Sequence, residues 1–162
     1  MDLLNTDRDL VLELSKSGRL PARLTSNPLA RELEGEILKL TTDSGDAVLA
    51  FEPPARFAQG GGVLQGGIIT ALLDFAMAFA AHAKLTGEQR TFATVSMNVH
   101  FLRPAPPARY IAHGHIVRAG RRLLFAEARL IAAAAPGDDD LSDISRRELT
   151  ATASAVLALS ER

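Results

Sequence analysis

One carboxylate, Asp74, stands alone in an apolar stretch of the chain. It is the only Asp, Glu, Lys or Arg residue between Arg56 and Lys84, within the sequence GGIITALLDFAMAFAAHA over residues 66–83. A buried carboxylate must be paired, hydrogen-bonded or protonated, because burying a bare charge is very costly. A glycine-rich loop, AQGGGVLQGG over 58–67, comes directly before this stretch. An acid buried on a helix that begins at glycines indicates a catalytic site.

The start of this predicted helix could supply the other half of such a site. Gly66 and Gly67 leave backbone N–H groups unobstructed at the positive end of the helix dipole, where they can stabilise an oxyanion. Asp74 lies two turns further on, about 10–12 Å along the axis, which is too far for one carbonyl group to touch both. A symmetric partner that lays its loop over the helix would solve the geometry.

Periodicity and turn signals predict the elements that position these residues. The predicted helices cover 6–17, capped by Thr6 and ended by Gly18, then 28–34 after a cap at Asn27, and about 67–84. The predicted strands cover 36–42, 47–53, 91–102, 109–119, 122–134 and 147–159, with a turn at 43–46, an irregular loop at 54–65 and a polar hairpin loop at 136–146. This order predicts an α+β fold in which an antiparallel sheet wraps around one long central helix. Residues 1–162 form one predicted domain, with about 1–25 as an N-terminal helical extension.

Two patterns predict which side chains share a face. In the strand 91–102, the alternation places Val95, Met97, Val99 and Phe101 on one face, and Thr94, Ser96, Asn98 and His100 on the other. In the long helix, a bulky stripe predicted to pack into the sheet consists of Ile68, Leu72, Phe75 and Phe79. Asp74 points instead to a face of small residues, where a ligand or another chain can come close.

Composition disfavours several classes of function. The net charge is −1 and the basic residues are dispersed, which gives no indication of nucleic acid or an anionic membrane as a partner. The absence of cysteine excludes disulfides, thiolate metal sites and a cysteine nucleophile, and agrees with a cytoplasmic location. Residues 66–83 are barely long enough to span a membrane and carry Asp74 and His82, so a membrane span is not expected. His113 and His115 share a strand face without a third ligand nearby, so no metal is expected.

Three segments together resemble one family. LQGGIITALLD (64–74), TVSMNVHFLRP (94–104) and GRRLLFAEARL (120–130) resemble the hotdog-fold acyl-CoA thioesterases of the phenylacetate-degradation (PaaI) type. The resemblance implies a hotdog fold, a homodimer or homotetramer with active sites at the dimer interface, and hydrolysis of an acyl- or aryl-CoA thioester to the free acid and CoA. It implies no separate cofactor, because CoA is part of the substrate.

The resemblance also implies roles for individual catalytic residues. Asp74 corresponds to the acid that acts as nucleophile or general base, and Gly66 to the glycine whose N–H polarises the thioester carbonyl. Gln59 stands where the family has an amide that orients the carbonyl or the water, and Thr94 where a hydroxyl helps to position the water. Asp74 and Thr94 would come from one subunit, and Gln59 and Gly66 from its partner. Gln65 stands where the family usually has histidine, and glutamine can form hydrogen bonds but cannot titrate.

The candidates for binding the substrate and its CoA phosphates are Gly67, Arg103, Arg121 and Arg122. Two alternative functions remain open at this point. A hotdog protein can bind acyl-CoA without turning it over, or it can act as an enoyl-CoA hydratase or dehydratase. The second alternative usually places a catalytic histidine near the helix, where this chain has Gln65.

Overall fold

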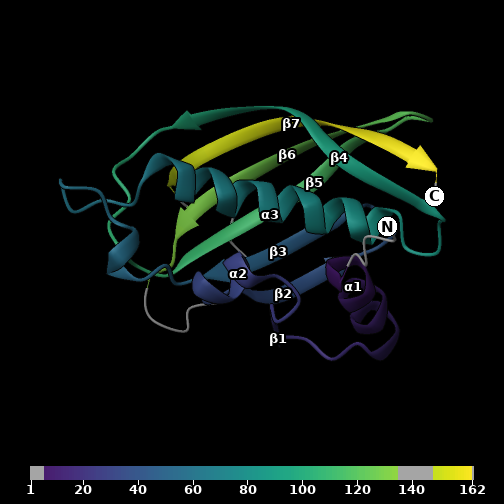
Figure 1. The fold of residues 1–162 in the computed structure, drawn as a ribbon, viewed down its shortest axis with the longest axis horizontal. Helices are drawn as coiled ribbons and strands as arrows, with labels where there is room; N and C mark the ends of the chain where they lie inside the picture. Colours follow the sequence, from purple (N-terminus) through teal and green to yellow (C-terminus); the bar gives the residue numbers. More distant parts are fainter. Residues whose placement is uncertain (1–5, 135–147, 162) are drawn as a thin grey trace.

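The computed structural model describes residues 6–134 and 148–161, and it has the predicted α+β arrangement (Figure 1). One long helix, α3 (Gly66–Lys84), is wrapped by a seven-stranded sheet whose neighbouring strands are all antiparallel, in the order β1-β2-β3-β5-β6-β7-β4. The strands are β1 (Ala22–Arg23), β2 (Glu36–Thr41), β3 (Asp46–Phe51), β4 (Arg90–Phe101), β5 (Tyr110–Ala119), β6 (Leu123–Ala132) and β7 (Leu149–Glu161). The remaining helices are α1 (Thr6–Ser17), α2 (Pro28–Glu32) and the 3₁₀ turn η1 (Ala55–Phe57).

The two N-terminal helices occupy the predicted positions, with one correction to a cap. Gly18, at φ 65°, ends α1 as predicted, because glycine adopts this left-handed conformation without steric cost. Asn27 caps α2 by accepting hydrogen bonds from two backbone N–H groups. Thr6 was predicted to cap α1, but it lies within the helix and its hydroxyl donates to the carbonyl of Ser26 at 3.0 Å.

Short-range structure departs from the prediction in three places. The hairpin between β2 and β3 turns at 42–45, one residue earlier than predicted, and β1 is a two-residue edge strand that carried no sequence signal. The segment 54–65, predicted to be irregular, contains η1 and an isolated bridge between Ala58 and Leu64. The predicted loop at 136–146 lies outside the described residues.

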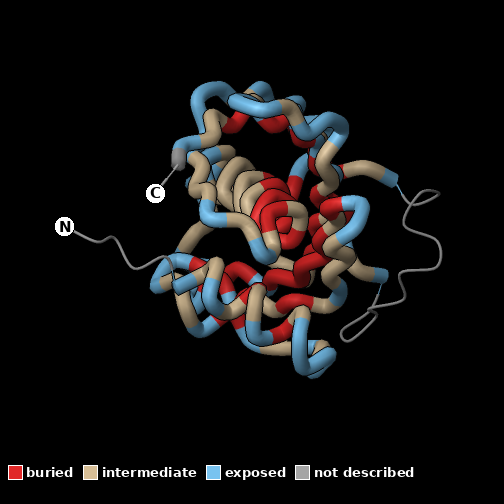
Figure 2. The backbone as a smooth tube through the Cα atoms, turned by 90° about the vertical axis from the view of Figure 1, so that its right-hand side faces the viewer, coloured by how far each residue is buried: buried red, intermediate tan, exposed pale blue. Residues whose placement is uncertain are grey.

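Helix α3 is the core helix of the fold. It is long and apolar enough to cross a membrane by length and composition, but 56% of its apolar window is buried inside the protein. Burial is densest in its C-terminal half, where the buried residues are Ala76, Met77 and those at 79–83. Figure 2, which looks along α3 from this end, shows the helix enclosed by the surrounding chain. The N-terminal half, which contains Asp74, is less completely covered.

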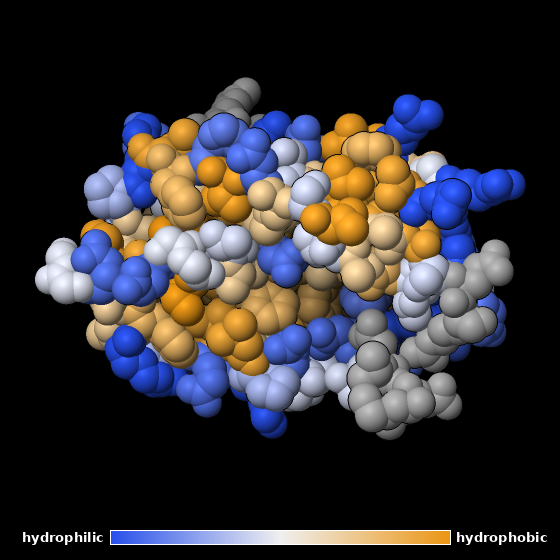
Figure 3. Space-filling view, turned by 45° about the horizontal axis from the view of Figure 1, so that its top comes forward, coloured by the Kyte–Doolittle hydropathy of each residue, from blue (hydrophilic) through white to orange (hydrophobic). Residues whose placement is uncertain are grey.

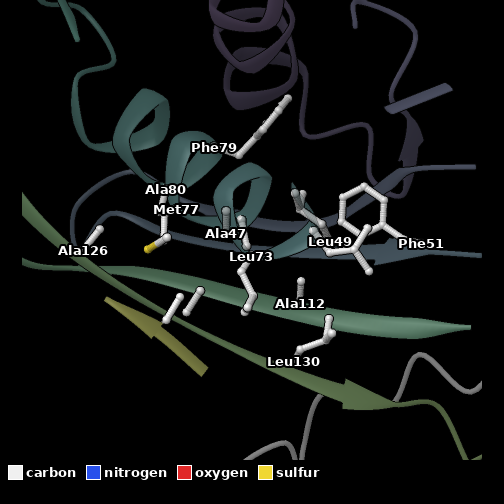
Figure 4. Packing of buried hydrophobic residues seen from close by; sticks show 14 of the residues in the cluster. Ala47, Leu49, Phe51, Leu73, Met77, Phe79, Ala80, Ala112, Ala126 and Leu130 are labelled. Carbon is white, nitrogen blue, oxygen red and sulfur yellow. The ribbon is translucent and has the colours of Figure 1, made fainter. Parts of the chain in front are cut away.

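The sheet reaches α3 through a contact between main chains. A Cβ atom added to Gly114 on β5 would lie 2.2 Å from the carbonyl oxygen of Ala76 and 2.7 Å from the nitrogen of Met77. Leu73 and Met77 point toward the sheet from the same side of the helix (Figure 4). Gly114 therefore allows the central strand to pack directly against the helix backbone.

The prediction that the bulky stripe of α3 packs into the sheet is only partly right, since Phe75 contacts Phe51 of β3 with ring centroids 5.8 Å apart but Phe79 does not face the sheet (Figure 4). Leu72 and Phe79 are fully buried, whereas Ile68 and Phe75 are only half-buried. Figure 4 shows Phe79 pointing away from the strands and toward α1. The reason is that this chain covers α3 from two sides, with the sheet on one side and α1 on the other, so apolar residues are required around more than one stripe.

The predicted alternation of side chains along β4 is interrupted by a bulge. The pairing of β4 with β7 shifts register between Thr94 and Ser96, so Val95 is an extra residue in the ladder. Before the bulge, Phe92 packs on the core and Thr94 points toward α3; after it, Met97 and Val99 pack on the core. Thr94 therefore shares the inner face with Met97, and Val95 is 63% exposed.

His82 is the one buried histidine among the described residues, and it lies near α1 at the end of α3. Its ring contacts the rings of Phe79 and Phe92, with centroids 6.1 and 4.7 Å away. Burial lowers the pKa of His82 from 6.5 to about 4, while the nearby Asp7 carboxylate raises it. The fold therefore holds this imidazole in its neutral form at neutral pH.

We expect Gly114→Ala to destabilise the protein by roughly 3 kcal/mol or more, because the new methyl group must displace the α3 backbone. Gly60→Ala is the matched control, since a Cβ at Gly60 meets no atom within 4 Å and its φ is not in the left-handed region. Urea unfolding of both variants measures the difference. Equal stability of the two variants would contradict the close packing of β5 on α3.

A second expectation concerns the stability of the protein at acidic pH. Because the pKa of His82 is lower in the folded state than in the unfolded chain, its contribution to stability is complete above pH 6.5 and is lost as the pH falls to about 4. The loss is on the order of 3 kcal/mol. Unfolding free energies measured from pH 4 to pH 7 should vary less in His82→Leu than in the wild type. The control His100→Leu, at an exposed histidine, should keep the wild-type pH dependence.

Candidate functional site

Asp74 lies half-buried on α3, and its carboxylate meets the edge strand of the sheet. Its Oδ1 atom accepts a hydrogen bond from the hydroxyl of Thr94 at 3.3 Å. Burial raises the pKa of Asp74 above its usual value, and the hydrogen bond from Thr94 opposes this shift. No ion pair to Asp74 is present among residues 6–134 and 148–161. The carboxylate is therefore a stronger base than a free aspartate, with a hydroxyl beside it.

The N-terminus of α3 presents two free backbone donors. Gln65 is the N-cap residue and provides no side-chain hydrogen bond to the helix. Within the described chain, neither Gly66 nor Gly67 donates its N–H to any acceptor. The ring of Phe101, on β4, lies over Gly66, 3.3 Å from where a Cβ atom would be. These two N–H groups are positioned to bind a partial negative charge.

The loop before α3 is ordered by its own hydrogen bonds. The backbone N–H of Gln59 donates to the carbonyl of Val63 at 2.8 Å, and the side-chain Oε1 of Gln59 accepts from Gly61 N–H at 2.7 Å. Gly62 adopts φ 78°, which requires glycine at the turn. Gln65 N–H donates to Phe57 O at 3.1 Å, which fixes the loop to the start of the helix. The side chain of Gln59 is exposed, and its Nε2 group remains available to donate a hydrogen bond.

The structure brings some of the predicted site residues together and separates others. Asp74 and Thr94 are in contact, as the hydrogen bond shows. Gly66 lies eight residues before Asp74 on the same helix, about 12 Å along the axis. Gln59 and Gln65 belong to the end of the molecule that carries Gly66. Within one chain, the carboxylate of Asp74 and the backbone donors at the start of α3 are therefore far apart.

The three candidate arginines are divided between the two ends of β4. Arg103 follows the end of the strand and forms a salt bridge with Glu148 at 3.0 Å. Arg121 and Arg122 lie in the turn between β5 and β6, which is joined to the start of β4 by a hydrogen bond from Arg90 to the carbonyl of Arg121 at 3.2 Å. A single substrate cannot reach both groups of arginines within one subunit.

Strand β4 forms the edge of the sheet next to Asp74. It is the last strand in the sheet order and pairs only with β7 among the described strands. The large exposed apolar residues on it and just after it are Val95, Phe101 and Leu102. Figure 3 shows that apolar surface is extensive on the side of the molecule that carries β4. A long edge strand with free backbone groups and apolar side chains favours pairing with another strand.

Two features of this site were not found from the sequence. The contact of Phe101 with Gly66 depends on where β4 crosses the start of α3, and no local pattern indicates such a crossing. The bulge that turns Thr94 toward Asp74 also carried no local signal, because an apolar–polar alternation continues through it.

The two histidines on β5 each lie beside a different carboxylate. His113 Nε2 lies 3.2 Å from Asp46 Oδ1, and His115 Nε2 lies 3.8 Å from Glu127 Oε2. In the part of the chain that the structure describes, no group of three or more His, Cys, Asp or Glu side chains could hold a metal ion. The chemistry that this site can perform with its own groups is therefore that of a carboxylate, a hydroxyl and backbone donors.

Comparisons with known proteins agree with the fold and with the family resemblance. A model of the thioesterase superfamily matches residues 61–134. A thioesterase family protein from Silicibacter pomeroyi has a TM-score of 0.72 and 25% identity, covering 96% of this chain and 99% of that chain. A phenylacetic acid degradation-related protein from Ralstonia eutropha has a TM-score of 0.71 and 24% identity, covering 91% and 98%. A mutant of the phenylacetic acid degradation protein PaaI from Thermus thermophilus has a TM-score of 0.65 and 23% identity, covering 82% and 98%. No curated protein matches the chain.

We expect Asp74→Asn to be more stable than the wild type at pH 7. Because the folded-state pKa of Asp74 is raised, the protein loses stability as the pH rises through that pKa and the carboxylate ionises. The difference in unfolding free energy between variant and wild type should vanish below pH 3.8, where both side chains are neutral.

Asp46→Asn is the matched control, because its effect on stability at pH 7 should have the opposite sign. Burial raises the pKa of Asp46, but hydrogen bonds with Ser44 and His113, together with electrostatic attraction to His113 and His115, lower it below its usual value. That variant should therefore be less stable than the wild type at pH 7. A loss of stability at pH 7 in Asp74→Asn as well would indicate a structural role for Asp74.

Proposed function

Because this chain belongs to the hotdog-fold thioesterase superfamily, we propose that it hydrolyses an acyl-CoA or aryl-CoA thioester to the free acid and CoA. The observation that carries the proposal is the half-buried carboxylate of Asp74, which is bonded by Thr94 and forms no ion pair in the described chain. A structural carboxylate in this position would gain stability from a cation or from several donors. Asp74 instead remains a poorly solvated base on the surface of a core helix.

Asp74 has two chemically balanced routes to the products. As a general base, it takes a proton from water, the resulting hydroxide adds to the thioester carbon, and CoA leaves as its thiol after reprotonation. As a nucleophile, it adds to the same carbon and expels CoA, and water then hydrolyses the mixed anhydride. In both routes the raised pKa of Asp74 increases its basicity, and the hydroxyl of Thr94 orients the carboxylate or the water.

The negative charge that develops on the carbonyl oxygen requires donors. The backbone N–H groups of Gly66 and Gly67 meet this requirement, because no acceptor in the described chain uses them. A donor of this kind contributes roughly 3–4 kcal/mol to transition-state stabilisation in other enzymes. The Nε2 group of Gln59 adds a donor from the same end of the molecule. Gln65 can support this loop by hydrogen bonding without taking part in proton transfer.

The distance between Gly66 and Asp74 makes a second subunit part of the proposal. Antiparallel pairing of β4 with β4 of a second copy would bring the α3 N-terminus of one subunit toward Asp74 of the other. Each dimer would then contain two equivalent sites, each with Asp74 and Thr94 from one subunit and with Gln59 and Gly66 from its partner. The exposed apolar residues of β4 support this assembly.

The test is steady-state hydrolysis of aryl, short-chain and long-chain acyl-CoA thioesters, followed by release of free thiol. We expect Asp74→Asn to lower kcat about a hundredfold or more on the substrate that the wild type prefers. We expect Thr94→Val to lower kcat/KM roughly tenfold, the effect of one hydrogen bond to a charged group. Ser96→Ala is the control on the same strand, because Ser96 lies on the opposite face of the sheet from the core.

The pH dependence adds an independent readout. The acidic limb of the kcat/KM profile should have a midpoint above pH 3.8, and Thr94→Val should move it upward, because the hydrogen bond from Thr94 lowers the pKa of Asp74. Full activity in Asp74→Asn would rule out the proposed role of the carboxylate. Tight acyl-CoA binding without hydrolysis would identify a binding protein, and hydration of an enoyl thioester would identify a hydratase.

A further inference from the structure

The ring of Phe101 closes one side of the two backbone donors at the start of α3. Its Cζ, Cε1 and Cε2 atoms lie 3.3, 3.6 and 4.0 Å from where a Cβ atom on Gly66 would be, so the far edge of the ring points at this residue. A Cβ atom on Gly67 would meet no atom within 4 Å. The donors therefore have a wall on the Gly66 side and open space on the Gly67 side.

The position of the ring explains why residue 66 is glycine. Gly66 does not have a φ in the left-handed region, so its backbone conformation does not require glycine. A Cβ atom 3.3 Å from the ring would be closer than ordinary van der Waals contact between carbon atoms. Glycine at this position therefore leaves room for the aromatic ring beside the donor.

The main chain on both sides of Phe101 is fixed by hydrogen bonds. Phe101 is paired with Ala151 of β7, and the next two backbone N–H groups donate to the carbonyl of Thr150 at 2.9 and 3.1 Å. The carbonyl of Ala105 accepts from Leu64 N–H at 2.7 Å, which ties the segment after β4 to the loop before α3. The ring projects from this fixed chain, and Phe101 is 53% exposed. It is therefore accessible to a ligand bound at the donors.

A thioester that binds these donors comes close to the ring. The N–H and the Cβ direction of a residue in the first turn both incline toward the N-terminal end of the helix. An oxygen that accepts from Gly66 N–H at about 2.9 Å therefore lies beside the edge of the Phe101 ring. The two substituents of the carbonyl carbon diverge, and the long CoA arm requires the open side at Gly67. The acyl carbon next to the carbonyl is then directed toward Phe101.

We propose that Phe101 is a specificity-determining residue, which contacts the acyl carbon next to the thioester carbonyl and restricts branching at that carbon. The substrates would then be thioesters whose acyl group begins with an unbranched carbon. An apolar ring suits this position, because the acyl group is hydrocarbon there whereas the CoA arm carries amide groups. This inference rests on the proposed function for the role of Gly66 and Gly67 as oxyanion donors. It sets no limit on the length of the acyl group beyond its first carbon.

The test compares steady-state hydrolysis of three acyl-CoA thioesters. n-Butyryl-CoA and isobutyryl-CoA are isomers that differ in branching next to the carbonyl, and isovaleryl-CoA is branched one carbon further on. We expect wild-type kcat/KM to be about tenfold higher for n-butyryl-CoA than for isobutyryl-CoA, the effect of one methyl group in a fitted site. Phe101→Ala should raise kcat/KM for isobutyryl-CoA relative to n-butyryl-CoA about fivefold, and should leave that for isovaleryl-CoA unchanged relative to n-butyryl-CoA. An unchanged ratio for isobutyryl-CoA would overturn the proposal.

The design separates a specific contact from a general loss of structure. A ratio of kcat/KM values for two substrates does not depend on the fraction of enzyme that is folded and assembled. A loss of stability or of dimer in Phe101→Ala therefore cannot imitate the expected change. Phe125→Ala is the matched control, because Phe125 is 38% exposed and lies on the outer face of β6, between the buried residues Leu124 and Ala126. This variant should keep the wild-type ratios.

Binding of unreactive analogues separates this proposal from the proposed function. In ketone analogues of n-butyryl-CoA and isobutyryl-CoA, a methylene group replaces the thioester sulfur, so they bind without being hydrolysed. Isothermal titration calorimetry should give a Kd about tenfold higher for the branched analogue in the wild type, and a smaller difference in Phe101→Ala. If the wild type hydrolyses none of the thioesters but this difference depends on Phe101, the contact stands and the hydrolase function fails. Hydrolysis by the wild type with the same selectivity in Phe101→Ala gives the opposite result.

Discussion

The contact of β5 with the backbone of α3 is the constraint on which the arrangement of the candidate site depends. Gly114 lies against the peptide between Ala76 and Met77, and this contact fixes the rotation of the helix relative to the sheet. Asp74 lies two residues before Ala76, about 200° around the helix, so it faces away from β5. Only an element on the far side of the helix can meet it. The curved sheet supplies that element, because β4 is its last strand and reaches the other side of α3 (Figure 1).

The position of Asp74 lowers the stability of the folded chain when its carboxylate is ionised. Burial raises its pKa, and one hydrogen bond from Thr94 compensates only in part. The bulge in β4 makes this single contact possible, because a regular strand would turn Thr94 to the outer face. The bulge therefore changes which side chain of β4 faces the helix. The exposure of Val95 at the edge of the sheet is a consequence of the same exchange.

The sequence predicted the parts of the fold that depend on local patterns. The apolar run ending at Lys84, the cap at Asn27 and the glycine after α1 each specify an element through its own residues. Periodicity and turn signals also predicted the order of the elements and an antiparallel sheet around the long helix. The family resemblance supplied the superfamily, which the comparisons bear out. The predicted alternation of side chains along β4 is wrong at Val95, because the bulge at that residue depends on how β4 pairs with β7. The prediction of which face of α3 packs on the sheet was incomplete because α1 covers a second side of that helix. The link from Arg90 to the turn at Arg121 carried no local signal, because it is a contact between distant segments.

The proposed function leads to one arrangement of substrate across a dimer. Along β4, the middle carries Thr94 beside Asp74, and the end of the strand carries Phe101 over Gly66. Antiparallel pairing of this strand with a second copy would reverse the order in the partner, so the Gly66 end of one subunit would point toward the middle of β4 in the other. A thioester beside Asp74 of one subunit would then meet the helix N-terminus of the partner with its carbonyl. Neither subunit alone offers both the base and the oxyanion donors within reach of one carbonyl group, so the dimer would be the smallest unit able to catalyse the reaction.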